Sequence, residues 1–201
     1  MRGRPVFGQV FFHAAKRRDE KGAVMGFLSG IFGNKSQSAT ESADAAAPTA
    51  APAIVVTCPV AGEAIDITEV NDAAFASKAM GDGIAIKPAE GTLVAPISGT
   101  VEALFPTGHA LAIKGDNGVS ILLHIGIDTV EMKGDGFNAR VAQGDHVEQG
   151  QLLVEFDLDK IAAAGFEATT MVLAAECPAE GTLAKCPSGP ISLGDRALWF
   201  A

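Results

Sequence analysis

The feature that most constrains the fold is a succession of short β-type runs that fills the chain from Ile54 to Phe200. Turn signals rich in glycine, proline and asparagine separate the runs. The expected strands are residues 54–57, 62–67, 83–87, 91–95, 99–104, 110–114, 119–125, 151–157, 171–174, 181–184 and 197–200. Helical turns are expected only at residues 72–77 and 158–164. Because strands follow one another without strand–helix alternation, we predict an all-β domain, an antiparallel sandwich or barrel with one or two short helical turns.

Charge and cysteine content narrow the class of function. The chain carries 15 Lys or Arg against 24 Asp or Glu, a formal net charge of −9. Such an acidic surface argues against nucleic acid as a partner, since phosphate binding needs basic side chains. Its three cysteines each precede a proline and show no CxxC spacing, so we expect no disulfide framework and a reducing, cytoplasmic setting.

The region before Ile54 differs in composition from the rest. Residues 1–24 are basic, and we expect them to be an upstream extension of the reading frame, with translation starting at Met25. Residues 25–33 can form a short amphipathic helix that contacts the inner face of the membrane peripherally. Residues 34–53 are rich in Ala, Ser, Thr and Pro, which predicts a disordered linker. We therefore predict a single folded domain over residues 54–201.

Two histidines lie in segments that should be half buried. His124 interrupts the apolar run that begins at Ser120, and His109 lies fifteen residues earlier, after Thr107-Gly108. Histidine can act as a nucleophile, an acid or base, or a metal ligand near neutral pH. The plain structural interpretation is that both are hydrogen-bonded histidines of a β core. The hydroxyl and flexible amide before His109, however, suit the binding of an anionic group.

Three chemistries could use this pair. A zinc site would need further ligands, with Asp128 as a third candidate. Hydrolysis would need a serine or cysteine nucleophile, but neither a Gly-x-Ser-x-Gly elbow nor a nearby cysteine is present. Covalent phosphoryl transfer would need one histidine with a free ring nitrogen and a second donor to neutralise phosphoryl oxygens.

Four segments together resemble a known family. They are Gly81–Pro88, Val94–Thr100, Thr107–Ala110 and His124–Phe137, which contains His-Ile-Gly-Ile-Asp-Thr-Val. The chain from about Ile54 to Phe200 resembles the glucose-type enzyme IIA component of the phosphoenolpyruvate-dependent sugar phosphotransferase system. The resemblance implies an antiparallel β-sandwich or barrel of the duplicated hybrid-motif type. It also implies a phosphotransferase component with a phosphohistidine intermediate.

The resemblance assigns roles within the pair. His124 matches the histidine that takes a phosphoryl group on Nε2 from the histidine-containing phosphocarrier protein and passes it to an enzyme IIB domain for sugar uptake. His109 matches the histidine that stabilises and releases the phosphoryl group, and Thr107 matches a hydroxyl in the surrounding hydrogen-bond network. The expected partner-binding face comprises Asp72, Phe75, Ala79, Met80, Phe105, Leu122 and Asp128.

Cofactors and regulation follow from the same resemblance. No cofactor is required, and zinc would bind between His109 and His124 only in a complex with a partner. Some unphosphorylated relatives regulate permeases and glycerol kinase. Four residues depart from those relatives, which leaves regulatory targets open: Ala74, Ala79, Leu122 and Ala103. Two alternatives remain: a biotinyl or lipoyl carrier domain, suggested by the Gly144–Gly150 turn, and a zinc endopeptidase of related β architecture.

Overall fold

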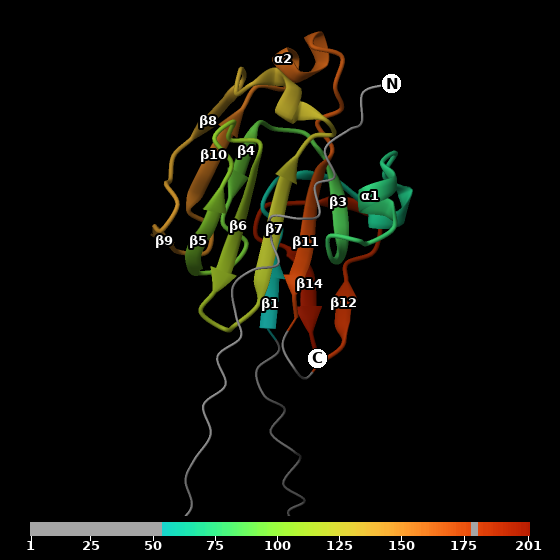
Figure 1. Cartoon of the computed structure of the whole chain (residues 1–201). Coiled ribbons are helices and arrows are strands. Elements are labelled where there is room, and N and C mark those ends of the chain that lie inside the picture. The colour runs from blue at the N-terminus through green and yellow to red at the C-terminus, as the bar shows by residue number, and fades with distance from the viewer. Residues whose placement is uncertain (1–53, 178–180) are drawn as a thin grey trace, which may run out of the picture. The chain divides into compact units, whose positions relative to one another are not determined.

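The computed structural model describes residues 54–177 and 181–201, which form an antiparallel β-sandwich with two short α-helices (Figure 1). Its strands are β1 (Ile54–Thr57), β2 (Gly62–Asp66), β3 (Asp82–Pro88), β4 (Thr92–Val94), β5 (Gly99–Leu104), β6 (Ala110–Gly115), β7 (Ser120–Ile125), β8 (Phe137–Ala139), β9 (His146–Val147), β10 (Leu152–Phe156), β11 (Thr170–Glu176), β12 (Leu183–Lys185), β13 (Gly189–Ile191) and β14 (Arg196–Phe200). The helical elements are η1 (Ile67–Glu69), α1 (Ala73–Ala76), η2 (Thr129–Met132) and α2 (Leu158–Ala163). The predicted all-β class is confirmed, whereas the expectations for residues 1–24 and 25–53 lie outside the described residues.

The strands form three sheets within the described residues. The largest is eight-stranded, in the order β13-β2-β3-β11-β7-β6-β5-β9. The other two are three-stranded, in the orders β1-β14-β12 and β4-β10-β8. None of the helices described over residues 54–177 and 181–201 is long and apolar enough to cross a membrane.

Each expected strand and both expected helical turns overlap an observed element, and the omissions are short strands. β8, β9 and β13 have two or three residues each, too few to show a two-residue alternation. β9 and β13 are also the edge strands of the large sheet. β13 contains Pro190, which an edge strand tolerates because one side of it needs no ladder hydrogen bonds.

The two faces of the large sheet are packed differently. One face joins the main core, to which the small sheets contribute Leu93, Leu153 and Leu198. The other face carries a smaller cluster: Ile67, Val70, Phe75, Ala85, Met171 and Leu173. Because side chains alternate along a strand, Leu123 of β7 joins the main core while Leu122 packs against the smaller cluster.

The smaller cluster is covered by a segment that leaves the sheet between β2 and β3, residues 67–81. We call it the covering segment. Asp72 begins α1, where its carboxylate accepts hydrogen bonds from the backbone N–H groups of Ala74 and Phe75, 2.8 and 3.1 Å away. This cap allows a helix of only four residues to form, and it places Phe75 against the sheet with 6% of its surface exposed.

Candidate functional site

Strand pairing brings His109 and His124 together. His124 lies near the end of β7, opposite Ala110 of β6 and Met171 of β11. His109 precedes β6, and its carbonyl accepts a hydrogen bond from the backbone N–H of Ile125 at 2.7 Å. The two imidazole rings are 4.9 Å apart between centroids and nearly perpendicular, at 84°. Residues fifteen apart in the sequence therefore form one compact pair.

The hydrogen bond of His124 determines which of its ring nitrogens is available. Nδ1 lies 2.8 Å from the carbonyl oxygen of Gly126, an acceptor, so in the neutral ring Nδ1 carries the proton and donates. Nε2 then bears the lone pair. Burial, together with the neighbouring His109, lowers the pKa of His124 from 6.5 to about 4, and this net value includes the opposing effects of the Gly126 carbonyl and the Asp72 carboxylate. His124 is therefore a neutral imidazole at pH 7.

His109 has a different set of neighbours. Its Nδ1 lies 2.5 Å from the hydroxyl oxygen of Thr107. Its Nε2 is buried and is the one buried side-chain nitrogen or oxygen without a hydrogen-bond partner among the described residues. Desolvation lowers the pKa of His109 to about 4. A buried polar atom left unpaired is costly, and here it lies in the ring that faces His124.

Two aromatic rings flank the pair. The Phe75 ring packs edge-on against His124, with centroids 5.1 Å apart, and the Phe105 ring packs edge-on against His109 at 5.5 Å. These rings exclude water from the imidazoles and cause part of the desolvation that lowers their pKa values. Phe75, predicted on the partner-binding face, lies mostly beneath the surface, whereas Phe105 is half-buried.

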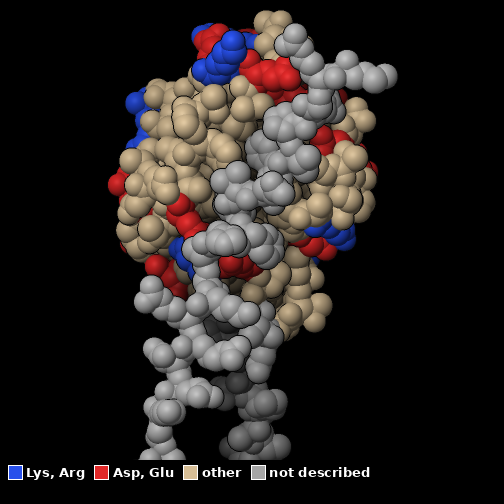
Figure 2. Space-filling model, viewed as in Figure 1, with Lys and Arg blue, Asp and Glu red and all other residues tan. Residues whose placement is uncertain are grey.

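The other predicted docking residues are buried to different depths. Met80 and Leu122 are half-buried and pack against the smaller cluster, as does Ile127, which the sequence did not single out. Ala79 and Asp128 are exposed, and Asp128 adopts a left-handed backbone with φ of 57°. The face in Figure 2 shows a broad area of uncharged side chains bordered by charged ones.

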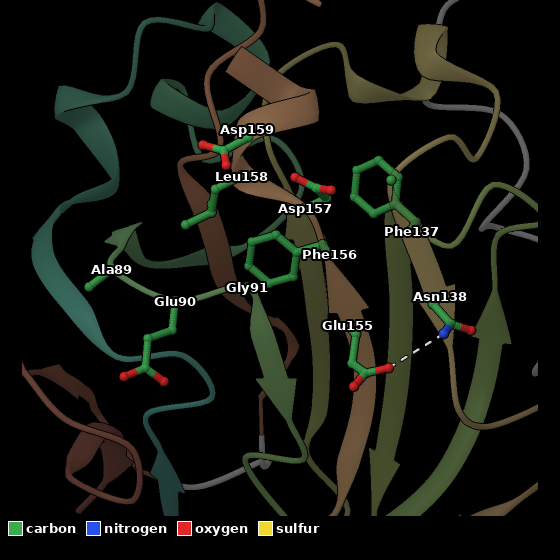
Figure 3. Close-up of a pocket in the computed structure, with 11 residues that line it drawn as sticks. Ala89, Glu90, Gly91, Phe137, Asn138, Glu155, Phe156, Asp157, Leu158 and Asp159 are labelled. Atoms are coloured by element: carbon green, nitrogen blue, oxygen red, sulfur yellow. Dashed lines mark hydrogen bonds between the residues drawn. The ribbon is translucent and has the colours of Figure 1, made fainter. Parts of the chain in front are cut away.

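One pocket of the described residues lies away from the histidines. It is a shallow depression of about 680 Å³ between the β3–β4 turn, the start of β8 and the start of α2 (Figure 3). Phe137 and Phe156 line it together with carboxylates such as Glu90 and Asp159, and none of the predicted site residues contributes. We assign the functional site to the histidine pair because the unpaired nitrogen and the lowered pKa values are found there.

The described residues do not bring together three or more His, Cys, Asp or Glu side chains that could hold a metal ion. His109 and His124 alone supply two ligands, fewer than a zinc ion generally takes from protein. Asp128, the third ligand considered from the sequence, does not complete such a group. A zinc ion at this pair would need ligands from another molecule.

One contributor to the site was missed from the sequence as a functional residue. The Gly126 carbonyl orients the His124 ring, and Gly126 can do so because its φ of +77° turns the chain immediately after β7. A Cβ at this position would lie 2.3 Å from the Thr129 side chain and 2.8 Å from the Glu167 carbonyl oxygen. The sequence feature that could have indicated this role is a glycine placed two residues after a histidine within a predicted strand.

The chain is thus a β-sandwich with a buried histidine pair at one face of its largest sheet. Residues 54–178 match the family described as phosphoenolpyruvate-dependent sugar phosphotransferase system, EIIA 1. The chain belongs to this family.

Two individual proteins agree with this assignment. The chain is 46% identical over 143 residues to the PTS system beta-glucoside-specific EIIBCA component of Halalkalibacterium halodurans, an alignment that covers 71% of this chain and 22% of that protein. It is also similar to the solved structure of glucose permease IIA from Mycoplasma capricolum, with a TM-score of 0.69 and 35% identity over 73% of this chain and 95% of the other. The chain thus matches about a fifth of the length of the curated relative.

Proposed function

We propose that this protein is a phosphocarrier in sugar uptake, with His124 as the residue that holds the phosphoryl group. The observation that carries the proposal is the hydrogen bond from Nδ1 of His124 to the Gly126 carbonyl, which leaves the Nε2 lone pair for attack. The low pKa of His124 keeps that lone pair unprotonated at pH 7. A neutral imidazole is the nucleophilic form of histidine.

The transfer step exchanges one P–N bond for another. Nε2 of His124 attacks the phosphorus of a donor phosphohistidine, the donor P–N bond breaks, and its electron pair returns to the donor ring. The proton stays on Nδ1 of His124 throughout and remains hydrogen-bonded to the Gly126 carbonyl oxygen. Because the broken and formed bonds are alike, the step is close to isoenergetic, and the protein contributes mainly positioning and charge stabilisation.

His109 supplies the charge stabilisation in this proposal. Thr107 Oγ1 lies 2.5 Å from Nδ1 of His109, and we propose that its hydroxyl is the donor, which would place the proton of the neutral ring on Nε2. That N–H is the buried group without a partner, and it lies in the ring adjacent to His124. A phosphoryl oxygen on His124 would accept its hydrogen bond, so the unpaired donor gains a partner in the phosphorylated state.

The donor and the acceptor are also part of the proposal. The histidine-containing phosphocarrier protein would be the donor, and an enzyme IIB domain of a sugar permease the acceptor. Support for the latter comes from the relative named EIIBCA, whose name joins EIIB, EIIC and EIIA in one component. We expect both to dock on the cytoplasmic side through the half-buried apolar residues Met80, Phe105 and Leu122, with the exposed carboxylate of Asp128 beside them.

We expect the transfer to need no cofactor. If zinc binds to this protein, His109 and His124 would be two of its ligands and a partner would supply the rest. The same pair cannot hold zinc and a phosphoryl group together, since both need Nε2 of His124. Zinc and phosphorylation would therefore be mutually exclusive.

Phosphoenolpyruvate-driven labelling with the two general phosphotransferase proteins tests the proposal. We expect one acid-labile phosphate on the wild type, none on His124→Gln, and a phosphate that is not passed on for His109→Gln. His146→Gln is the matched control, since His146 is an exposed histidine paired with Asp116, and it should label like the wild type. Normal labelling of His124→Gln, or a biotin or lipoyl adduct on a lysine, would contradict the assignment.

A further inference from the structure

We propose that Lys185 is a positioning residue. It forms ion pairs at both ends of the covering segment and so keeps Phe75 and Asp72 close to His124. The expected effect on the phosphorylation of His124 rests on the function proposed above, whereas the expected effect on the order of the covering segment does not. Lys185 lies in β12, which belongs to a different sheet from His124.

The geometry of Lys185 is that of one cation shared by two carboxylates. Its Nζ lies 2.8 Å from Oδ2 of Asp66 and 3.0 Å from Oδ1 of Asp82. The Lys185 side chain is 21% exposed, whereas the two carboxylate side chains are 38% and 37% exposed. Fixing the Lys185 side chain in one conformation costs entropy once but forms two partly buried ion pairs. Each pair should therefore stabilise the fold more than an isolated ion pair on the open surface does.

The two carboxylates mark the two ends of the covering segment. Asp66 is the last residue of β2 and Asp82 the first of β3, so the segment leaves the sheet after one and returns at the other. The strands are in register here, with Asp66 paired to Ile84. Lys185 thus bridges the base of the segment.

Each carboxylate also holds part of the covering segment itself. Asp66 caps η1 by accepting hydrogen bonds from the backbone N–H and the hydroxyl of Thr68, at 3.0 and 2.7 Å. Asp82 accepts a hydrogen bond from Lys78, just after α1, at 2.9 Å. The hydrogen bond from Lys185 is the main cause that lowers the pKa of Asp66, consistent with a carboxylate held in its charged form.

The covering segment supplies the histidine site with two features. Phe75 packs on the His124 ring, and the charge of Asp72 raises the pKa of His124 against the effect of burial. α1 has only four residues, too few to be stable without tertiary contacts. The ion pairs of Lys185 at both ends of the covering segment therefore affect how far the His124 ring is shielded from solvent.

The experiment compares Lys185→Met with Lys185→Arg and with Lys160→Met, which removes a lysine–aspartate pair elsewhere, between Lys160 and Asp135. For Lys185→Met we expect amide hydrogen exchange across residues 67–81 to accelerate by about tenfold, the scale of one or two lost ion pairs. The pKa of His124, followed by NMR titration, should rise as its cover loosens, because the loss of burial outweighs the loss of the nearby Asp72 charge. Phosphorylation of His124 should slow, Lys185→Arg should restore all three readouts, and Lys160→Met should match the wild type.

The outcomes separate this proposal from the proposed function. If Lys185→Met matches Lys160→Met in both exchange and His124 titration, Lys185 is not a positioning residue, whatever the labelling shows. If the wild type accepts no phosphate, the proposed function fails, while exchange and titration still decide the role of Lys185. Should Lys185→Met not fold, Asp82→Asn removes one of the two contacts of Lys185 together with the Lys78–Asp82 pair, and Lys78→Met removes that pair alone. Exchange and titration must then move in the same direction as expected above, and further in Asp82→Asn than in Lys78→Met.

Discussion

At the scale of single residues, the proposed function has the Thr107 hydroxyl donate to Nδ1 of His109 and so place the ring proton on Nε2. That hydroxyl is 2.5 Å from Nδ1 of His109. We expect Thr107→Val to leave His124 able to accept a phosphoryl group but to slow onward transfer on the order of tenfold, about the value of one hydrogen bond in a transition state. Thr107→Ser keeps the hydroxyl and should transfer at close to the wild-type rate. Equal rates for the valine and serine variants would show that the hydroxyl does not orient His109.

The histidine pair also predicts how stability depends on pH. Both pKa values are lowered from 6.5 to about 4, so the unfolded chain binds protons in this range that the folded protein does not. The free energy of unfolding should therefore be greatest above pH 6.5 and fall as the pH drops toward 4, by on the order of 5 kcal/mol for the two histidines together. Urea unfolding at several pH values measures this.

The matched control for the pH prediction is the double variant His109→Gln and His124→Gln. Its unfolding free energy should change much less between pH 6.5 and pH 4, because glutamine does not titrate. The carboxylates of Asp66 and Asp82, whose pKa values are also lowered, lose their contribution only at lower pH. An equally steep loss in the double variant would assign the pH dependence to groups other than the pair.

At the scale of elements, the turn after β7 is the most constrained part of the site. Gly126→Ala should destabilise the protein by about 3 kcal/mol or more, because alanine is strained at φ of +77° and its Cβ would meet Thr129 and the Glu167 carbonyl. Gly118→Ala is the matched control: φ is +87°, but the space around it is open, so about 1 kcal/mol is expected. Thermal unfolding of both variants gives the comparison, and equal losses would mean that crowding at Gly126 does not matter.

The sequence predicted the elements whose pattern is local. The alternation in β7 and the turn residues around it were sufficient to predict a strand through His124, and the helical turn expected at residues 72–77 overlaps α1. β9 and β13 were not predicted, because strands of two or three residues are defined by pairing with a distant partner. The site was predicted through the Thr107–His109 and His124 motifs, whereas Lys185 could not be, since its contacts span 119 and 103 residues.

At the scale of the whole molecule, β1 decides where the folded domain begins. β1 pairs with β14, and it contributes Val56, which is fully buried, as is Cys58 just after it. A protein that starts at Ile54 should unfold with the same free energy as the full chain. One that starts at Pro59 should lose on the order of 3–6 kcal/mol, from two lost buried side chains and an exposed strand edge.

Circular dichroism during urea unfolding measures both truncated proteins. Trp199 fluorescence is less suitable, because Trp199 lies opposite Val55 of β1 and would respond to the truncation directly. A large loss of stability on removing residues 1–53 would contradict the predicted domain boundary.

The most direct test of the central claim is where the phosphoryl group is attached. Nitrogen-15 and phosphorus-31 NMR of the phosphorylated protein distinguish the two nitrogens of each histidine ring. We predict a single phosphate on Nε2 of His124, with Nδ1 still protonated and hydrogen-bonded to the Gly126 carbonyl. A phosphate on Nδ1 of His124, or on His109, would contradict the account.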